Sequence, residues 1–239
     1  HARERGRRIV CLNNVRQLGL AMQVYWGDHR DVSPAAGLAG EVWLCDWLQW
    51  PDYWHGVGGA QHTGIQRPVP GVLMPYVGNP APKLLWCPSD LVLSRTLWKL
   101  NSFPTELSTM CPFSYGLNCG TRATGPPALW PGMASVIPAK GIGFTDGIRS
   151  SLDALNLHNF TATAIKSPSQ KILFADKCMA YEDSSRVTLH GTVSAAWFWP
   201  TDGLTTRHSG RGTVACADGH VEAVKPTFGT QREHYDPLY

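Results

Sequence analysis

The residues best suited to chemistry lie near the C-terminal end of the chain. His208 is separated by nine residues from the dipeptide Asp218-Gly219. A histidine with an aspartate is typical of acid–base catalysis and of metal binding. Asp-Gly is also the dipeptide that a type I′ hairpin turn favours, and a histidine can fix the chain entering a hairpin through a backbone hydrogen bond. We favour this structural interpretation of His208, Asp218 and Gly219.

Other catalytic and metal-binding patterns do not occur in the sequence. It contains neither G-x-S-x-G nor H-E-x-x-H, and Ser209 is not a nucleophile merely because it adjoins His208. Calcium needs about 6–8 oxygen ligands, and no compact acidic loop supplies them. The sequence therefore predicts no enzyme, no cofactor and no assignable metal site. Calcium binding stays an open alternative without an assigned site. The aspartates that could contribute ligands are Asp146, Asp153, Asp176, Asp183, Asp202 and Asp218.

A tryptophan-rich segment is the other candidate site. Trp43, Trp47, Trp50 and Trp54 recur every three to four residues, so they would share one face if the segment were helical. Such a face can form an aromatic platform for a glycan or a partner protein. The alternative is that the rings cover the core beneath a long loop, and we favour this second interpretation.

The cysteines give a mixed signal. Seven are present and none forms a C-x-x-C pair, which argues against a thiolate zinc site. Because the number is odd, at least one thiol is unpaired or is paired with another chain. The count is compatible with an oxidising compartment. Cys216 is expected to be a core residue of the hairpin.

The composition is that of a globular protein. Hydrophobic residues make up 43% of the 239 residues and charged residues 16%. The net charge is +3, and much of it lies in the first eight residues, so no broad basic surface for nucleic acid is expected. No apolar run reaches the roughly 18 residues of a membrane span, and no signal peptide is recognisable.

The elements that position these residues begin with a long helix, predicted over Arg3–His29. Its apolar residues recur in steps of three and four. We expect its apolar face to be covered from about Leu12 onward, with the first two turns protruding. Because the helix begins in a basic cluster without a capping residue, we also expect it to be the C-terminal half of a longer helix. The residues of the predicted face are Ile9, Leu12, Val15, Leu18, Met22 and Tyr25 or Trp26.

Short strands follow, separated by loops rich in glycine and proline. The clearest is the hairpin Gly212–Val224, in which a two-residue turn at Asp218-Gly219 would pair Cys216 with Val221. The pattern predicts an α+β fold, with a long N-terminal helix packed against a small antiparallel sheet. Lys171–Ala175 is expected to be a buried strand, and Lys83–Asp90 is expected to contain a short strand that ends at Pro88. Phe113–Asn118 is a short strand or a turn into one, and Val193–Trp199 is another strand or part of a loop.

Four stretches together resemble one family. They are Cys11–Pro34, Trp86–Asp90 with Ser114–Asn118, Lys166–Cys178, and Arg207–Val224 with its H-X9-DG motif. They resemble the type IV pilin-like pseudopilins (type II secretion system G-like), in particular the group found in planctomycetes and verrucomicrobia. The resemblance covers about a third of the chain in the expected order.

The resemblance implies a prepilin with a leader, a cleavage and methylation site, and an apolar half-helix that anchors the protein in the bacterial inner membrane. It also implies one pilin-like domain over residues 1–239, with a stem helix (1–29), a loop-rich middle (30–165) and a C-terminal sheet with its hairpin (166–239). Because Cys11 and Cys87 lie in two of the family motifs, a disulfide between them would connect the helix to the sheet.

The expected function is assembly and not catalysis. The chain would be a subunit of a type II secretion pseudopilus or a type IV pilus, on the periplasmic or extracellular face. Its partners would be other pseudopilins, secretion-system components and, through loops, secreted cargo. The alternative function is an extracellular glycan- or protein-binding module that uses the tryptophan segment.

Overall fold

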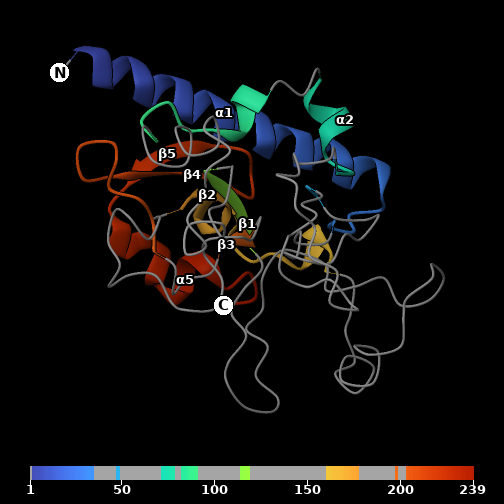
Figure 1. The fold of residues 1–239 in the computed structure, drawn as a ribbon. Helices are drawn as coiled ribbons and strands as arrows, with labels where there is room; N and C mark the ends of the chain where they lie inside the picture. Colours follow the sequence, from blue (N-terminus) through green and yellow to red (C-terminus); the bar gives the residue numbers. More distant parts are fainter. Residues whose placement is uncertain are drawn as a thin grey trace, which may run out of the picture.

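A computed structural model describes the part of the chain that forms the helix, the sheet and their immediate connections (Figure 1). The described residues are 2–34, 47–48, 71–78, 82–90, 114–118, 160–177, 197–198 and 203–239. The predicted loops at 35–82 and 119–160 lie largely outside them.

Helix α1 spans Ala2–Asp28 and confirms the predicted long helix. Val15, Leu18 and Met22 are fully buried on its inner face, as their spacing predicts. The helix ends where Arg30 and Asp31 adopt positive φ, and the Asp31 amide donates to the Trp26 carbonyl at 2.8 Å.

The buried face begins near Leu12, as predicted: Ile9, in the first turns, is 64% exposed, whereas Cys11 is buried. Its composition differs from the prediction, because the polar residue Asn14 is buried as well. The buried stripe is therefore rotated toward residues that make polar contacts beneath the helix, which a count of apolar residues alone does not reveal. The first turns extend past the sheet, but they do not simply protrude, because Glu4 is half-buried against Ser89.

The sheet has five strands in the order β3-β1-β2-β4-β5. All neighbouring pairs are antiparallel except β1 and the two-residue strand β3, which are parallel. This arrangement confirms the α+β fold, with α1 packed across one face of a small, mainly antiparallel sheet. The strands are β1 (Tyr115–Asn118), β2 (Ile172–Asp176), β3 (Trp197–Phe198), β4 (Gly212–Cys216) and β5 (Val221–Val224).

Both faces of the central strands are buried. Leu117, Phe174 and Ala215 pack with the inner face of α1. On the opposite face, Val214 and Phe198 pack with residues from the C-terminal tail. The sheet therefore lies between α1 and the tail (Figure 1). The remaining short elements are α2 (Met74–Val77), α5 (Arg232–Tyr235) and the 3₁₀ helices Pro82–Leu85, Ala162–Ala164, Pro168–Gln170 and Pro226–Thr230.

The predicted hairpin exists, but its turn is longer by one residue. Only Gly219 has positive φ (92°), whereas a type I′ turn would also require it at Asp218. The Gly219 amide donates to the Cys216 carbonyl and the Cys216 amide to the His220 carbonyl, each at 2.9 Å, which is a three-residue loop with a bulge. Val221 therefore pairs with Ala215 and not with Cys216. This shift places Val221 on the helix side of the sheet.

The strand predicted over Lys83–Asp90 is wrong. Pro82–Leu85 forms a 3₁₀ helix, followed by turns in which the Asp90 amide donates to the Cys87 carbonyl at 2.9 Å. Proline is compatible with the first position of a helix because its missing N–H has no helical partner there. The compact segment turns Cys87 inward, where it is fully buried.

Candidate functional site

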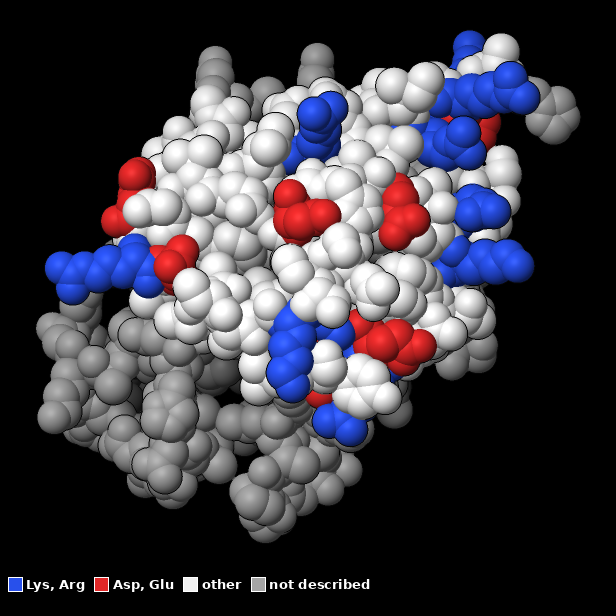
Figure 2. Space-filling view, turned by 180° about the vertical axis from the view of Figure 1, so that it is seen from behind, with Lys and Arg blue, Asp and Glu red and all other residues white. Residues whose placement is uncertain are grey.

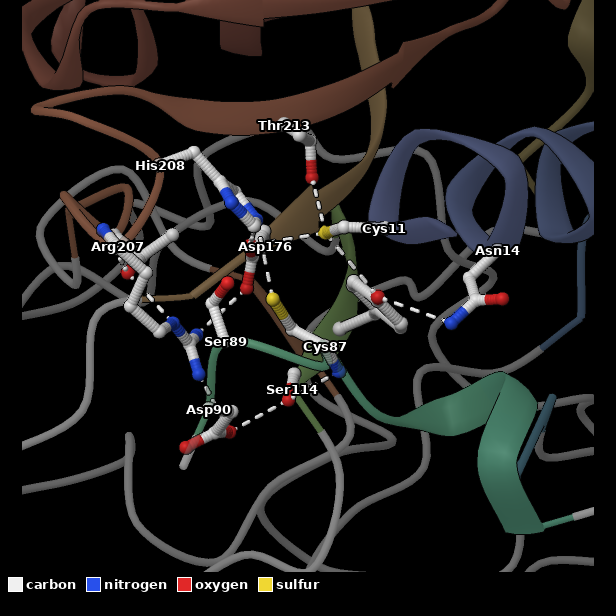
Figure 3. A network of polar contacts seen from close by, with 12 residues as sticks. Cys11, Asn14, Cys87, Ser89, Asp90, Ser114, Asp176, Arg207, His208 and Thr213 are labelled. Atoms are coloured by element: carbon white, nitrogen blue, oxygen red, sulfur yellow. Dashed lines mark hydrogen bonds and ion pairs between the residues drawn. The ribbon is translucent and has the colours of Figure 1, made fainter. Parts of the chain in front are cut away.

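Four polar side chains meet between α1 and the sheet. They are Cys11 from α1, Cys87 after the 3₁₀ helix, Asp176 at the end of β2, and His208 in the turn that precedes β4 (Figure 3). Each is at most 1% exposed. One ligand atom from each side chain lies within 4.8 Å of the other three. We call these residues the Cys–Cys–Asp–His cluster.

The imidazole of His208 connects the cluster to the start of α1. Its Nδ1 lies 2.9 Å from Glu4 Oε1, and its Nε2 lies 3.1 Å from Cys87 Sγ and 3.5 Å from Asp176 Oδ2. Burial alone would lower the pKa of His208, but its bonds to Asp176 and Cys87 raise the pKa to about 10. Without a metal the ring is therefore an imidazolium that donates from both nitrogens.

The two thiols have different surroundings. Cys11 Sγ donates to Asp176 Oδ2 at 3.3 Å, lies 3.0 Å from Thr213 Oγ1, and accepts from the Tyr115 hydroxyl at 3.3 Å. Burial raises the pKa of Cys11 well above its ordinary value. The hydrogen bond from Cys11 lowers the pKa of Cys87, and His208 adds to that effect. The thiolate therefore forms more readily at Cys87.

Arg207 holds the outer side of the cluster in place. Its guanidinium bridges two buried carboxylates, with Nη1 at 2.5 Å from Asp90 Oδ2 and Nη2 at 2.6 Å from Asp176 Oδ1. Asp90 also accepts from the Ser114 hydroxyl at 2.6 Å, and Ser114 Oγ in turn accepts from the Cys87 amide at 2.9 Å. The rotamers of Asp176 and the backbone of Cys87 are thus fixed by one continuous network (Figure 3).

The residues of the H-X9-DG motif are not brought together. His208 is buried in the cluster, whereas Asp218 lies at the hairpin turn, where it accepts from the His220 amide at 3.1 Å and contacts His220 Nδ1 at 2.6 Å. A joint site of His208 and Asp218 is therefore wrong. The structural role predicted for His208 was incomplete: its amide does donate to the Arg211 carbonyl at 3.2 Å, but its ring binds side chains.

The predicted disulfide is not formed in this structure. Cys11 and Cys87 are both free thiols, although the prediction that they lie together is correct. Cys216 is a buried core residue on the opposite face of the sheet, as expected.

One tryptophan of the predicted aromatic platform is buried and cannot contact a ligand at the surface. Trp47 is fully buried and its ring packs edge-on against Phe174, with centroids 5.2 Å apart. The covering role favoured from sequence is correct for this residue. Trp43, Trp50 and Trp54 lie outside the described residues.

Sequence reasoning missed the cluster because its members are far apart along the chain. The sequence presents Asp176 only as one of six aspartates that could bind calcium, and it gives no sign that Glu4, inside the basic helix start, has a partner far along the chain. The usable signal was a buried strand that ends in an aspartate, since Ile172–Asp176 is apolar until its last residue. Only the three-dimensional arrangement joins it to Cys11 and His208.

The surface opposite the view of Figure 1 carries charges of both signs (Figure 2). Basic side chains gather at the N-terminal end of α1, and elsewhere on this face lysines and arginines alternate with acidic residues among larger uncharged areas. Among the described residues, no helix is long and apolar enough to cross a membrane.

A family model matches the N-terminal part of the chain. Residues 1–54 match a family described as a protein of unknown function (DUF1559). No curated protein and no solved structure matches the chain. The matched residues include the whole of α1, and therefore Glu4 and Cys11.

Proposed function

We propose that this chain is a pilin-like subunit that assembles into a filament through α1. The observation that carries the proposal is a set of large hydrophobic side chains that are exposed on the outward face of this helix. Six large hydrophobic side chains are exposed among the described residues, and four of them lie on α1: Ile9 (64%), Val10 (48%), Leu20 (48%) and Val24 (54%). At 3.6 residues per turn, all four fall within an arc of about 100°.

The glycines of α1 support an outer helix partner. A Cβ added at Gly19 would lie 3.3 Å from the Ala215 side chain, so this glycine serves the packing of α1 on the sheet. A Cβ added at Gly6 would have no neighbour within 4 Å. Glycine inside a helix costs about 1 kcal/mol relative to alanine. The fold of the single chain therefore does not require a glycine at position 6. Because Gly6 has no side chain, a second helix could approach α1 closely at this position.

The filament we propose is of the type II secretion pseudopilus or type IV pilus kind. The four motifs noted in the sequence support this assignment, and the family match covers the same helix. The subunit would stand on the periplasmic or extracellular face, held at the inner membrane before assembly. Its partners would be other subunits of the filament. Cargo would contact the subunit through the segments that the sequence predicts to be loops, which lie largely outside the described residues.

We propose a structural and not an enzymatic role. The side chains best suited to catalysis are those of the Cys–Cys–Asp–His cluster, and each of these residues is at most 1% exposed. A substrate would not reach them without opening the contact between α1 and the sheet. Glycan binding by the tryptophan segment is the weaker candidate, because Trp47 is directed into the core.

The test is a charge placed on the outward face of α1 in the full-length gene product. Leu20→Glu and Val24→Glu should abolish multimers recovered by cross-linking and density-gradient fractionation. Leu238→Glu is the matched control, since Leu238 is similarly exposed (46%) but belongs to the C-terminal tail. The melting temperature of each variant should stay near that of the parent.

Two results would contradict the proposal. One is that Leu20→Glu and Val24→Glu assemble as well as Leu238→Glu. The other concerns the reading frame upstream of His1: a prepilin requires a cleavage site of the Gly-Phe-Thr-Leu-x-Glu kind followed by about twenty apolar residues. A frame without that segment would exclude anchoring and assembly by this route.

A further inference from the structure

We propose that Cys11, Cys87, Asp176 and His208 form a structural zinc site. The inference is independent of the proposed assembly function. It rests on four buried ligand atoms that converge between α1 and the sheet, and on further side chains that hold these ligands in orientation (Figure 3).

The separations between ligand atoms fit a tetrahedral ion. Zinc–sulfur bonds of about 2.3 Å and zinc–nitrogen or zinc–oxygen bonds of about 2.0–2.2 Å place tetrahedral ligands about 3.3–3.8 Å apart. Cys87 Sγ lies 3.1 Å from His208 Nε2, and Cys11 Sγ lies 3.3 Å from Asp176 Oδ2. His208 Nε2 and Asp176 Oδ2 are 3.5 Å apart. The other three pairs of ligand atoms lie within 4.8 Å of one another, so side-chain adjustments on the order of 1 Å or less would seat the ion.

The ligand types select zinc over the alkaline-earth ions. Calcium and magnesium take oxygen ligands almost entirely, whereas this cluster offers two sulfurs, one imidazole nitrogen and one carboxylate oxygen. Four protein ligands complete the tetrahedral shell, so no position is left for water or substrate. Such a closed site is structural. Zinc would displace the thiol protons and the Nε2 proton of the imidazolium.

The surroundings supply the outer contacts that zinc sites use. Glu4 Oε1 lies 2.9 Å from His208 Nδ1, so the carboxylate orients the ring and leaves Nε2 directed to the ion. Arg207 occupies Asp176 Oδ1 at 2.6 Å, which leaves Oδ2 for the metal. The hydroxyl groups of Tyr115 and Thr213 contact Cys11 Sγ at 3.3 and 3.0 Å and can stabilise a thiolate.

A disulfide between Cys11 and Cys87 is the competing state, because sulfurs in a disulfide are no longer thiolate ligands. The geometry favours the metal. A disulfide would remove the thiol that donates to Asp176 Oδ2 and would make no use of the Glu4–His208 pair. Zinc satisfies all four side chains at once.

A second group of possible ligands serves as an internal control. Cys216, His220 and Glu222 also have ligand atoms within 4.8 Å of one another, but His220 is exposed and Glu222 only half-buried. This group offers three ligands, and His220 Nδ1 is already engaged by Asp218.

The experiment is metal binding by the whole chain after reduction and removal of metal. Native mass spectrometry with Zn²⁺ should show uptake that depends on the cluster. Co²⁺ should give sulfur-to-cobalt charge-transfer absorption and the visible spectrum of a tetrahedral ion. Cys11→Ser and His208→Gln should each lose one bound ion, whereas Cys216→Ser and His220→Gln should retain it. Comparing variants also separates this site from metal held by cysteines elsewhere in the chain.

A further variant covers the case in which the ligand variants do not fold. Glu4→Gln keeps all four ligands and should weaken zinc binding about 10–100-fold, as loss of an outer carboxylate partner does elsewhere. Unchanged zinc affinity in Glu4→Gln would overturn the proposal, and so would unchanged uptake by folded Cys11→Ser. So would a reduced chain that takes up no Zn²⁺, or native protein that carries a Cys11–Cys87 disulfide and no metal.

Discussion

Removing the charge of Arg207 should destabilise the protein strongly. Its guanidinium lies 2.5 Å from Asp90 and 2.6 Å from Asp176, and the side chains of the three residues are at most 6% exposed. Arg207→Met retains most of the apolar stem but leaves two buried carboxylates without their cation. Breaking a buried pair by removing one partner costs about 3–5 kcal/mol, against a total stability of about 5–15 kcal/mol.

The loss is large enough to measure directly. A domain of about 150–250 residues loses about 2–4 °C in melting temperature per kcal/mol, so the expected decrease is about 6–20 °C. Urea unfolding of the metal-free chain gives the free energy. Arg211→Met is the matched control, because Arg211 is exposed and the hydrogen bond that its guanidinium donates to the Ala223 carbonyl, at 3.0 Å, is solvent-accessible. Its cost should stay within about 0.5 kcal/mol.

A double variant separates the ion pair from simple loss of packing. If the unpaired carboxylate is the cause, Asp90→Asn added to Arg207→Met should recover part of the lost stability, whereas Asp90→Asn alone should be destabilising. Equal costs for Arg207→Met and Arg211→Met would refute the reasoning, as would double variants whose losses simply add.

Three further outcomes follow from the packing and the hairpin. Gly19→Val should cost about 1–3 kcal/mol in urea unfolding because its side chain meets Ala215, whereas Gly6→Ala, with nothing nearby, should stabilise the isolated chain by up to about 1 kcal/mol. Trp47→Ala should cost about 3–5 kcal/mol by the same measurement, and a smaller loss would argue against its burial on Phe174. Burial raises the pKa of Asp218, but hydrogen bonds from the amide and ring of His220 together outweigh it and lower the pKa overall. Its contribution is therefore present above the ordinary aspartate pKa and is lost as pH falls through the lowered folded value, so Asp218→Asn should flatten that part of a stability-against-pH curve.

The main elements of the fold could be predicted from local patterns. The spacing of apolar residues was sufficient for α1, and the apolar run before Asp176 was sufficient for β2. The hairpin was found from Asp-Gly, but its register was missed. A three-residue loop with a bulge uses the same glycine as a two-residue turn, and only the backbone angle at Asp218 distinguishes them.

The site could not be predicted in the same way. Cys11 and Asn14 are buried because they form hydrogen bonds with polar groups beneath the helix. Those groups belong to segments more than seventy residues away in the sequence. The resemblance to pseudopilins did bring Cys11 and Cys87 together, but as a disulfide. Neither periodicity nor turn chemistry carries information on Asp176, His208 and Glu4 as a group, since their association exists only after the helix has packed on the sheet.

The contact of Glu4 with His208 and Ser89 has a mechanical consequence. A pull along the axis of α1 from its N-terminal end would not first peel the helix from the sheet one turn at a time. The load would enter at Glu4 and Cys11, close to the end where it is applied, and pass sideways into β2 and β4 through Asp176 and Thr213. Bonds loaded in parallel by shear must break together. The helix and the sheet would therefore respond to tension as one stiff body.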